Sequence, residues 1–248
     1  MAKWLDATVV ENRQWNDQLH SLRLDADFPE FKAGQFTRLA LEVDGEQISR
    51  PFSLVNAPGQ RPLDFYFIAV PGGTMSTRLA NLRAGDEIQI ADKASGLLTI
   101  DQVPEAKHLY LLSTGTGVGP FLSIIKTADT WKHFDKVVLV HAVRYQDELT
   151  YQDTIAEVQA EQPDNFIYIP MVSREDCDFA LSGRIPQAIE DGRLSHWTGL
   201  ALTPEHSQVM LCGNPAMIQD TMDLLIEKYD MKKHSRREPG HISIEKYW

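Results

Sequence analysis

The sequence predicts two domains, an antiparallel β-barrel followed by an α/β domain built on a parallel sheet. Up to about residue 100, short segments rich in β-branched and aromatic residues alternate with Gly, Pro and Asp turns. Beyond that point, continuous apolar segments alternate with helical patterns, as expected for strands that are buried on both faces. The 248-residue chain is long enough for two domains of about 100–150 residues each.

The first half contains six expected strands and one short helix. Asp44-Gly45 lies between two alternating segments, which is a strong signal for a two-residue hairpin turn. Many short strands separated by turn residues are typical of an antiparallel sandwich or barrel. The expected strands are Asp6–Asn12, Leu19–Leu24, Phe36–Val43, Ile48–Leu54, Leu63–Ala69 and Glu87–Ile90, and the expected helix is Ser76–Asn81.

The domain boundary is expected near residue 101, which gives a barrel over residues 1–101 and an α/β domain over residues 102–248. The second half begins with the apolar strand Leu109–Leu112, and strands and helices then alternate. This alternation implies a parallel sheet covered by helices. The further strands are Val137–Ala142, Phe166–Val172, Gln208–Cys212 and His241–Tyr247, and the helices are Phe121–Asp129, Thr150–Glu161, Ile185–Asp191 and Pro215–Lys228.

Composition argues against several classes of function. A formal net charge of −11 is opposite in sign to that of a nucleic-acid-binding protein, and anionic membrane surfaces repel it. The two cysteines, Cys177 and Cys212, provide no disulfide framework and no zinc or iron–sulfur ligand set, so we expect no metal. The sequence shows no signal-peptide pattern and no apolar segment of about 20 residues, so we expect a cytoplasmic protein.

A glycine-rich turn, Gly115-Thr116-Gly117-Val118-Gly119, lies between the first strand and the first helix of the α/β domain. Glycines at this point let the backbone approach a pyrophosphate, and a helix N-terminus adds free N–H groups. The turn has neither the Gly-x-Gly-x-x-Gly spacing nor the Lys of a P-loop. It is therefore compatible with a dinucleotide site or with a tight turn that binds no ligand.

Three arginines favour NADP over NAD as the nucleotide. NAD-binding domains usually carry an acidic residue near the end of the second strand, where this chain has Arg144. Ser173-Arg174 and Arg184 also follow expected strand ends, where open α/β sheets bind their ligands. Arginine pairs well with a phosphate dianion, although a single such residue is more often a solvated surface group.

Three further motifs are uninformative by themselves. Arg50-Pro51-Phe52-Ser53 lies in an expected barrel strand, and Cys212-Gly213-Asn214-Pro215 joins an expected strand to a helix that Asn214 can cap. The chain ends in Glu245-Lys246-Tyr247-Trp248, whose two aromatic residues need packing partners.

Taken in order, these motifs resemble those of the ferredoxin–NADP⁺ reductase family, and the Tyr-Trp ending resembles its bacterial ferredoxin/flavodoxin reductases. The resemblance covers essentially the whole chain. It implies an FAD-dependent enzyme that transfers electrons between NADPH, which gives a hydride, and ferredoxin or flavodoxin, which accept single electrons. The family also suggests a monomer.

The resemblance assigns roles to individual residues. The FAD-binding set is Arg50, Pro51, Phe52, Ser53, Phe67, Ile68, Ala69, Thr74, Met75, Ser76, Thr116, Tyr247 and Trp248. The NADP-binding set is Val143, Arg144, Ser173, Arg174, Arg184, Met210, Leu211, Cys212, Gly213 and Asn214. The catalytic set is Ser53, Cys212, Glu245 and Tyr247, with Tyr247 covering the flavin as a gate that moves before the nicotinamide binds.

Phe52 departs from the family pattern, which usually has Tyr at this position. Phenylalanine keeps the aromatic ring but loses the hydroxyl donor. We therefore expect FAD to be retained and held somewhat more weakly.

Two other functions use similar residues: a free-flavin or ferric reductase on the same scaffold, and a non-enzymatic NADP sensor. A docking surface for an acidic carrier argues against the first. The segment Met231–Arg237 contains Lys232, Lys233, Arg236 and Arg237 and no acidic residue, and we expect these four, together with Arg83, to form that surface. Cations at a helix end are an alternative explanation for some of these residues. The combination of Ser53, Cys212 and Glu245 argues against a sensor.

Overall fold

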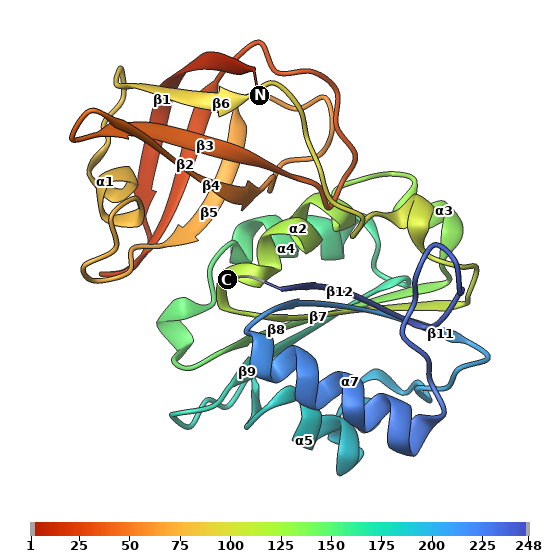
Figure 1. Ribbon diagram of the computed structural model, residues 1–248. Coiled ribbons are helices and arrows are strands. Elements are labelled where there is room, and N and C mark those ends of the chain that lie inside the picture. The colour runs from red at the N-terminus through yellow and green to blue at the C-terminus, as the bar shows by residue number, and fades with distance from the viewer. Residues whose placement is uncertain (1–2, 247–248) are drawn as a thin grey trace. The chain divides into compact units, whose positions relative to one another are not determined.

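A computed structural model of the protein describes residues 3–246 (Figure 1). The chain forms two compact units, which are described separately. The first contains the chain up to Thr99 together with Gly119–Thr127, and the second contains Ile100–Val118 and the chain from Ala128 onward. No helix within residues 3–246 is long and apolar enough to cross a membrane.

The first unit is a six-stranded antiparallel sheet with the strand order β4-β3-β6-β1-β2-β5. Its strands curl so that Leu54, just after β4, forms a bridge with Phe65 of β5, which brings the two edge strands together. The strands are β1 (Trp4–Gln14), β2 (Leu19–Asp25), β3 (Phe36–Val43), β4 (Glu46–Ser53), β5 (Leu63–Ile68) and β6 (Glu87–Ala91), and α1 covers Ser76–Asn81. The expected hairpin is confirmed, because Asp44 and Gly45 both have positive φ and Val43 pairs with Glu46.

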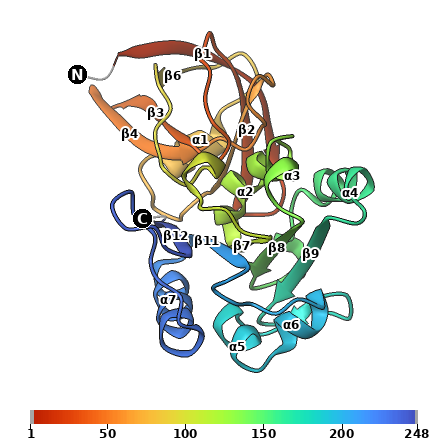
Figure 2. The same cartoon turned by 90° about the vertical axis from the view of Figure 1, so that its right-hand side faces the viewer.

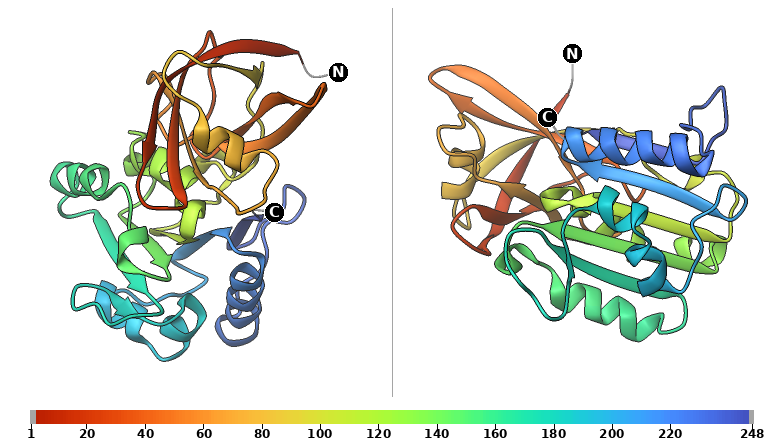
Figure 3. Two further views of the ribbon diagram at one scale, coloured as in Figure 1. Left: turned by 90° about the vertical axis from the view of Figure 1, so that its left-hand side faces the viewer. Right: turned by 90° about the horizontal axis from the view of Figure 1, so that it is seen from below.

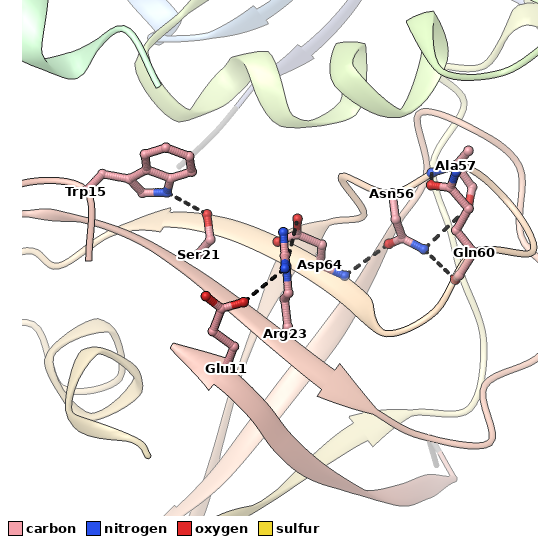
Figure 4. Close-up of polar contacts among 8 residues, drawn as sticks. All are labelled: Glu11, Trp15, Ser21, Arg23, Asn56, Ala57, Gln60 and Asp64. Atoms are coloured by element: carbon pink, nitrogen blue, oxygen red, sulfur yellow. Dashed lines mark hydrogen bonds and ion pairs between the residues drawn. The ribbon is translucent and has the colours of Figure 1, made fainter. Parts of the chain in front are cut away.

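The core of this unit is formed by apolar side chains from alternate strand positions, including Leu22, Leu39 and Phe65. A polar network lies on β1, β2, β5 and the loop that precedes β5 (Figure 4). Arg23 forms an ion pair with Glu11 at 2.9 Å and approaches the buried Asp64 at 3.8 Å.

Asn56 extends this network into the loop that joins β4 to β5. Its side-chain oxygen accepts the Asp64 N–H at 3.0 Å, and its amide donates to the Gln60 carbonyl at 2.8 Å. The loop that follows the Arg50–Ser53 motif is thereby held to the barrel by buried hydrogen bonds.

The second unit contains a six-stranded parallel sheet with the order β10-β9-β8-β7-β11-β12. Helices α5 and α7 pack on one face and α4 on the other (Figures 1 and 2). Figure 3 shows this sheet from below, with α7 beside β11. The strands are β7 (His108–Thr114), β8 (Lys136–Val143), β9 (Phe166–Val172), β10 (Leu181–Ser182), β11 (Ser207–Gly213) and β12 (Ile242–Lys246). The helices are α3 (Thr130–His133), α4 (Gln152–Glu161), α5 (Ile185–Glu190), α6 (Arg193–Thr198) and α7 (Pro215–Tyr229).

The predicted fold class is confirmed, while two helix predictions were wrong in detail. The segment expected as one helix over Phe121–Asp129 is α2 (Gly119–Ile125), a break, and then α3. The helix expected to begin at Thr150 begins at Gln152, because Tyr151 adopts a left-handed conformation with φ 56°. The helix α6 and the short strand β10 were not expected from the sequence.

Candidate functional site

Arg144, Arg174 and Arg184 lie along one edge of the parallel sheet of the second unit. Arg144 follows β8, Arg174 follows β9 by one residue, and Arg184 follows β10, and these three strands are adjacent in the sheet. Backbone hydrogen bonds continue the pairing past the strand ends, since the Arg174 N–H donates to the Arg144 carbonyl at 2.9 Å. The structure therefore brings together three residues that are up to 40 positions apart in the sequence.

The three guanidinium groups are available to bind an anion. All three residues are exposed, and within residues 3–246 none of them forms an ion pair. Ser173, which precedes Arg174 in the sequence, is also exposed, and its hydroxyl donates to the Val143 carbonyl at 3.1 Å. Clustered guanidinium groups without counter-ions fit a phosphate dianion, which can accept bidentate hydrogen bonds.

The glycine-rich turn lies against the end of β11. A Cβ atom on Gly117 would lie 2.6 Å from the Cys212 carbonyl oxygen, and one on Gly213 would lie 2.3 Å from Thr114 Oγ1. Gly213 also has φ +126°, which side-chain-bearing residues rarely adopt. Both glycines are required by close backbone approach, and the neighbouring Thr116 is buried.

Four polar side chains form a row across four adjacent strands. Glu245 of β12 is in register with Cys212 of β11, Cys212 with Ser113 of β7, and Ser113 with His141 of β8. Aligned residues of neighbouring parallel strands point to the same face and lie about 4.8 Å apart. Their face is opposite to that of Leu211 and Val140, which belong to the apolar core under α5 and α7. The row therefore concentrates ionisable groups at the carboxyl end of the sheet.

Glu245 is suited to hold a proton near neutral pH. Its Oε1 atom is buried and has no hydrogen-bond partner among residues 3–246. Burial raises the pKa of the carboxyl from 4.5 to about 7. Protonated and ionised forms are therefore both populated at pH 7, as a group that gives and takes a proton requires.

His141 was missed by sequence reasoning. It is completely buried, and neither of its ring nitrogens has a hydrogen-bond partner among the described residues. Burial lowers its pKa from 6.5 to about 4, so the ring is neutral at pH 7. The available signal was a histidine inside the apolar strand Val137–Ala142, whose neighbours on both sides are buried.

The other residues predicted to bind the nucleotide are distributed along the same strand ends. Val143 is the last residue of β8, and Met210 to Gly213 are buried in β11. Asn214 caps α7 as expected, since its Oδ1 accepts the N–H groups of Ala216 and Met217 at 2.9 and 3.3 Å. Its own N–H donates to Thr114 Oγ1 at 2.9 Å, which again joins β11 to β7.

In the first unit, the predicted FAD-binding residues of β4 lie on an edge strand. Arg50 is exposed, and its guanidinium donates only to the adjacent Ser49 carbonyl at 2.8 Å within the described part of the chain. The Phe52 ring meets the Phe67 ring edge to face, with centroids 6.1 Å apart, and Ser53 is buried. Pro51 is accommodated because it lies on the edge of the sheet.

The second predicted FAD segment is the turn that leads into α1. Ser76 Oγ accepts the Val70 N–H at 3.0 Å, and a Cβ on Gly73 would lie only 2.6 Å from that oxygen. Thr74 is exposed and Met75 is buried. Ile68 and Ala69, which connect β5 to this turn, are half-buried.

This donor set fits a cofactor that carries both phosphate and an aromatic ring system. The unpaired Arg50 guanidinium suits a pyrophosphate, and Phe52 offers a ring face or edge for an isoalloxazine. The predicted contributions of Tyr247 and Trp248 lie outside the described residues.

Comparison with known proteins identifies both halves of the chain. Residues 6–93 match the family model described as an oxidoreductase FAD-binding domain, and residues 111–223 match the oxidoreductase NAD-binding domain. The chain is 44% identical to the flavodoxin/ferredoxin–NADP reductase of Escherichia coli strain K12 over 248 residues, with 100% of each chain covered. It is 38% identical to the ferredoxin–NADP reductase of Pseudomonas aeruginosa, with 96% of this chain and 95% of that protein covered.

A solved structure agrees with these relatives. The crystal structure of a ferredoxin–NADP⁺ reductase from Neisseria gonorrhoeae with bound FAD and NADP matches with a TM-score of 0.93 and 31% identity. The match covers 99% of both chains.

Proposed function

Because this chain belongs to the flavodoxin/ferredoxin–NADP⁺ reductase family, we infer that it is an FAD-dependent oxidoreductase that transfers electrons between NADPH and ferredoxin or flavodoxin. The observation that carries this conclusion is 44% identity over the full length of a protein with that name. When bound, FAD accepts the two electrons of a hydride together and releases them singly, which matches the donor to the carriers.

We propose that residues 102–248 bind NADP(H), with Arg144, Ser173, Arg174 and Arg184 holding the 2′-phosphate. Three exposed guanidinium groups at adjacent strand ends, which have no counter-ion in the described part of the chain, support this assignment. The nicotinamide end is assigned to Met210–Asn214, where the glycine turn and β11 approach each other closely. Val143 completes the proposed NADP set.

Residues 1–101 are proposed to bind FAD, with Arg50 paired to the pyrophosphate and Phe52 against the ring system. Arg50, which has no ion pair within residues 3–246, and the edge-to-face packing of Phe52 on Phe67 support this proposal. The remaining proposed FAD residues are Pro51, Ser53, Phe67, Ile68, Ala69, Thr74, Met75, Ser76, Thr116, Tyr247 and Trp248.

Proton handling is assigned to Glu245, whose buried carboxyl changes its protonation state near pH 7. Cys212 is its neighbour in the sheet and is proposed to orient the reacting end of the nicotinamide. Ser53 and Tyr247 complete the proposed catalytic set.

We propose that carrier docking uses the loop that connects α7 to β12. Lys232, Lys233, Arg236 and Arg237 are exposed, and none forms an ion pair within residues 3–246. The loop contacts the segment before β7, since the Arg236 guanidinium donates to Gln102 Oε1 at 3.2 Å. A local patch of exposed cations can attract an acidic carrier despite the net charge of −11. Arg83 is proposed as a further contributor, and the protein as a cytoplasmic monomer.

A free-flavin or ferric reductase and a non-enzymatic NADP sensor are not favoured, because the full-length relatives are named as reductases of ferredoxin or flavodoxin. The decisive experiment is NADPH-driven reduction of cytochrome c with and without added ferredoxin or flavodoxin. A carrier-dependent increase in rate is expected. A rate that is unaffected by either carrier, but increased by free flavin, would assign the chain to the free-flavin reductases.

A further inference from the structure

The backbone at the start of the loop that begins with Arg144 is held by the carboxylate of Glu148. Glu148 Oε2 accepts the backbone N–H of Arg144 at 2.7 Å and that of Tyr145 at 3.3 Å. Both residues lie beyond Val143, the last residue of β8. Hydrogen bonds to an ionised acceptor are stronger than those between neutral groups, so this carboxylate fixes the backbone of both residues.

Glu148 is itself held firmly. Residues Gln146–Glu148 form a 3₁₀ turn that is closed by hydrogen bonds from the Glu148 N–H to the Tyr145 carbonyl and from the Leu149 N–H to the Gln146 carbonyl, both 3.1 Å. Leu149 is buried and packs with Val143 and Val172, the last residues of β8 and β9. The carboxylate therefore projects from a turn that is anchored in the apolar core.

A second carboxylate connects this loop to the next one. Glu175 Oε1 accepts the Gln146 N–H, and the preceding residue, Arg174, donates its own N–H to the Arg144 carbonyl at 2.9 Å. The loops that carry Arg144 and Arg174 are thus hydrogen-bonded to each other through backbone groups.

These two acidic residues would be unfavourable near a phosphate if charge were their only contribution. Each adds a negative charge close to residues that are proposed to bind a dianion, and like charges repel. Neither forms an ion pair with an arginine among the described residues, and both are used on backbone amides. Their value to the site must therefore be geometric.

We propose that Glu148 is a positioning residue for NADP(H) recognition: by holding the backbone of Arg144 and Tyr145, it sets the guanidinium of Arg144 against the 2′-phosphate. This inference rests on the 2′-phosphate site proposed above. Positioning and charge make opposite predictions for the loss of Glu148. A positioning role predicts weaker phosphate binding, whereas a purely electrostatic role predicts tighter binding.

The test measures binding of 2′,5′-ADP and of 5′-AMP to the FAD-loaded enzyme by calorimetry. Glu148→Ala is expected to weaken 2′,5′-ADP binding about 10-fold and to leave 5′-AMP binding unchanged, since only the former carries the 2′-phosphate. Glu148→Gln retains an oxygen acceptor and should bind 2′,5′-ADP within about two-fold of the wild type or more tightly. In steady-state assays Glu148→Ala should raise KM for NADPH with little change in kcat.

Asp147→Asn is the matched control, because it removes a charge from the same turn at an exposed residue that forms no hydrogen bond among the described residues. It should not weaken 2′,5′-ADP binding. Glu148→Asp retains the charge but withdraws the acceptor by one methylene, so it should also weaken binding. This variant keeps the question answerable if Glu148→Ala does not fold.

Two results would overturn the inference. One is unchanged or tighter 2′,5′-ADP binding by both Glu148→Ala and Glu148→Asp, and the other is an equal loss in Glu148→Gln and Glu148→Ala. Failure of the wild type to prefer 2′,5′-ADP over 5′-AMP would instead refute the 2′-phosphate site itself, and the role of Glu148 with it. Arg174→Ala, which should lose the preference, distinguishes these cases.

Discussion

Replacing His141 with leucine should make the protein more resistant to acid. The imidazole is completely buried, and its two nitrogens have no hydrogen-bond partner within residues 3–246. An apolar side chain of similar size removes two unsatisfied polar atoms, so His141→Leu should cost little stability at pH 7. The effect of the substitution should therefore depend mainly on pH.

The magnitude follows from the pKa of His141, which burial lowers from 6.5 to about 4. Between these values the unfolded chain binds a proton that the folded protein does not, so wild-type stability falls as pH decreases from 6.5 towards 4. At about 1.4 kcal/mol per pH unit, the loss is about 2 kcal/mol at pH 5 and about 3 kcal/mol below pH 4. The leucine variant lacks this loss.

Glu245 affects stability in the opposite direction. Its pKa is raised to about 7, so the folded protein binds the additional proton and stability decreases as pH rises from 4.5 through 7. The two residues are three strands apart, about 14 Å, so their effects should add. Between pH 4.5 and 6.5 the two residues therefore change the stability of the wild type in opposite directions. Only the difference in stability between His141→Leu and the wild type isolates the contribution of His141.

Urea unfolding at saturating FAD, followed by tryptophan fluorescence at pH 7, 6 and 5, measures this difference. The free energy of unfolding of His141→Leu relative to wild type should increase by about 2 kcal/mol from pH 7 to pH 5. His133→Gln is the control, because it removes a histidine that is exposed on α3 rather than buried. A difference between His141→Leu and wild type that is the same at all three pH values would show that His141 is not a buried neutral group.

Three further outcomes are expected. Arg174→Ala should raise KM for NADPH and leave NADH use nearly unchanged, and the wild type should prefer NADPH by at least ~10²-fold in kcat/KM; equal use of both nucleotides by the wild type contradicts this. Glu245→Gln should remove an ionisation near pH 7 from the pH profile of kcat, because glutamine cannot release a proton; an unchanged profile assigns that ionisation elsewhere. The double change of Arg236 and Arg237 to Glu should slow carrier reduction severalfold at low salt and much less above about 0.1 M, with ferricyanide reduction nearly unaffected; parallel losses in both assays would argue against a docking role.

Local sequence signals predicted the elements that are determined locally. The Asp44-Gly45 turn and the Asn214-Pro215 helix start formed as expected, because positive φ and side-chain capping depend on the residues themselves. The prediction of one helix over Phe121–Asp129 was wrong at its C-terminal end. There the Thr127 N–H donates to the Ile124 carbonyl, a tightened last turn, and the chain begins α3 only at Thr130.

The polar row on the parallel sheet could not be predicted from the sequence. Glu245, Cys212, Ser113 and His141 become neighbours only because β7 lies between β8 and β11 and β12 pairs with β11. Strand order and register between segments about 100 residues apart are set by tertiary packing rather than by local pattern. The loop carboxylate of Glu148 was also missed. A capping box usually has Ser or Thr at its N-cap position, and this chain has Tyr145 there.

The close approach of Gly117 to the Cys212 carbonyl limits how this protein can evolve. A Cβ atom on Gly117 would lie 2.6 Å from that carbonyl oxygen, well short of the 3.4 Å at which ordinary contact begins. Even a methyl group would therefore displace backbone beside the thiol. Gly117 is therefore nearly fixed. The loops with Arg144 and Arg174 are exposed and can change without disturbing that backbone. A lineage, or an engineer, can thus alter the proposed 2′-phosphate site while leaving the proposed reaction centre intact.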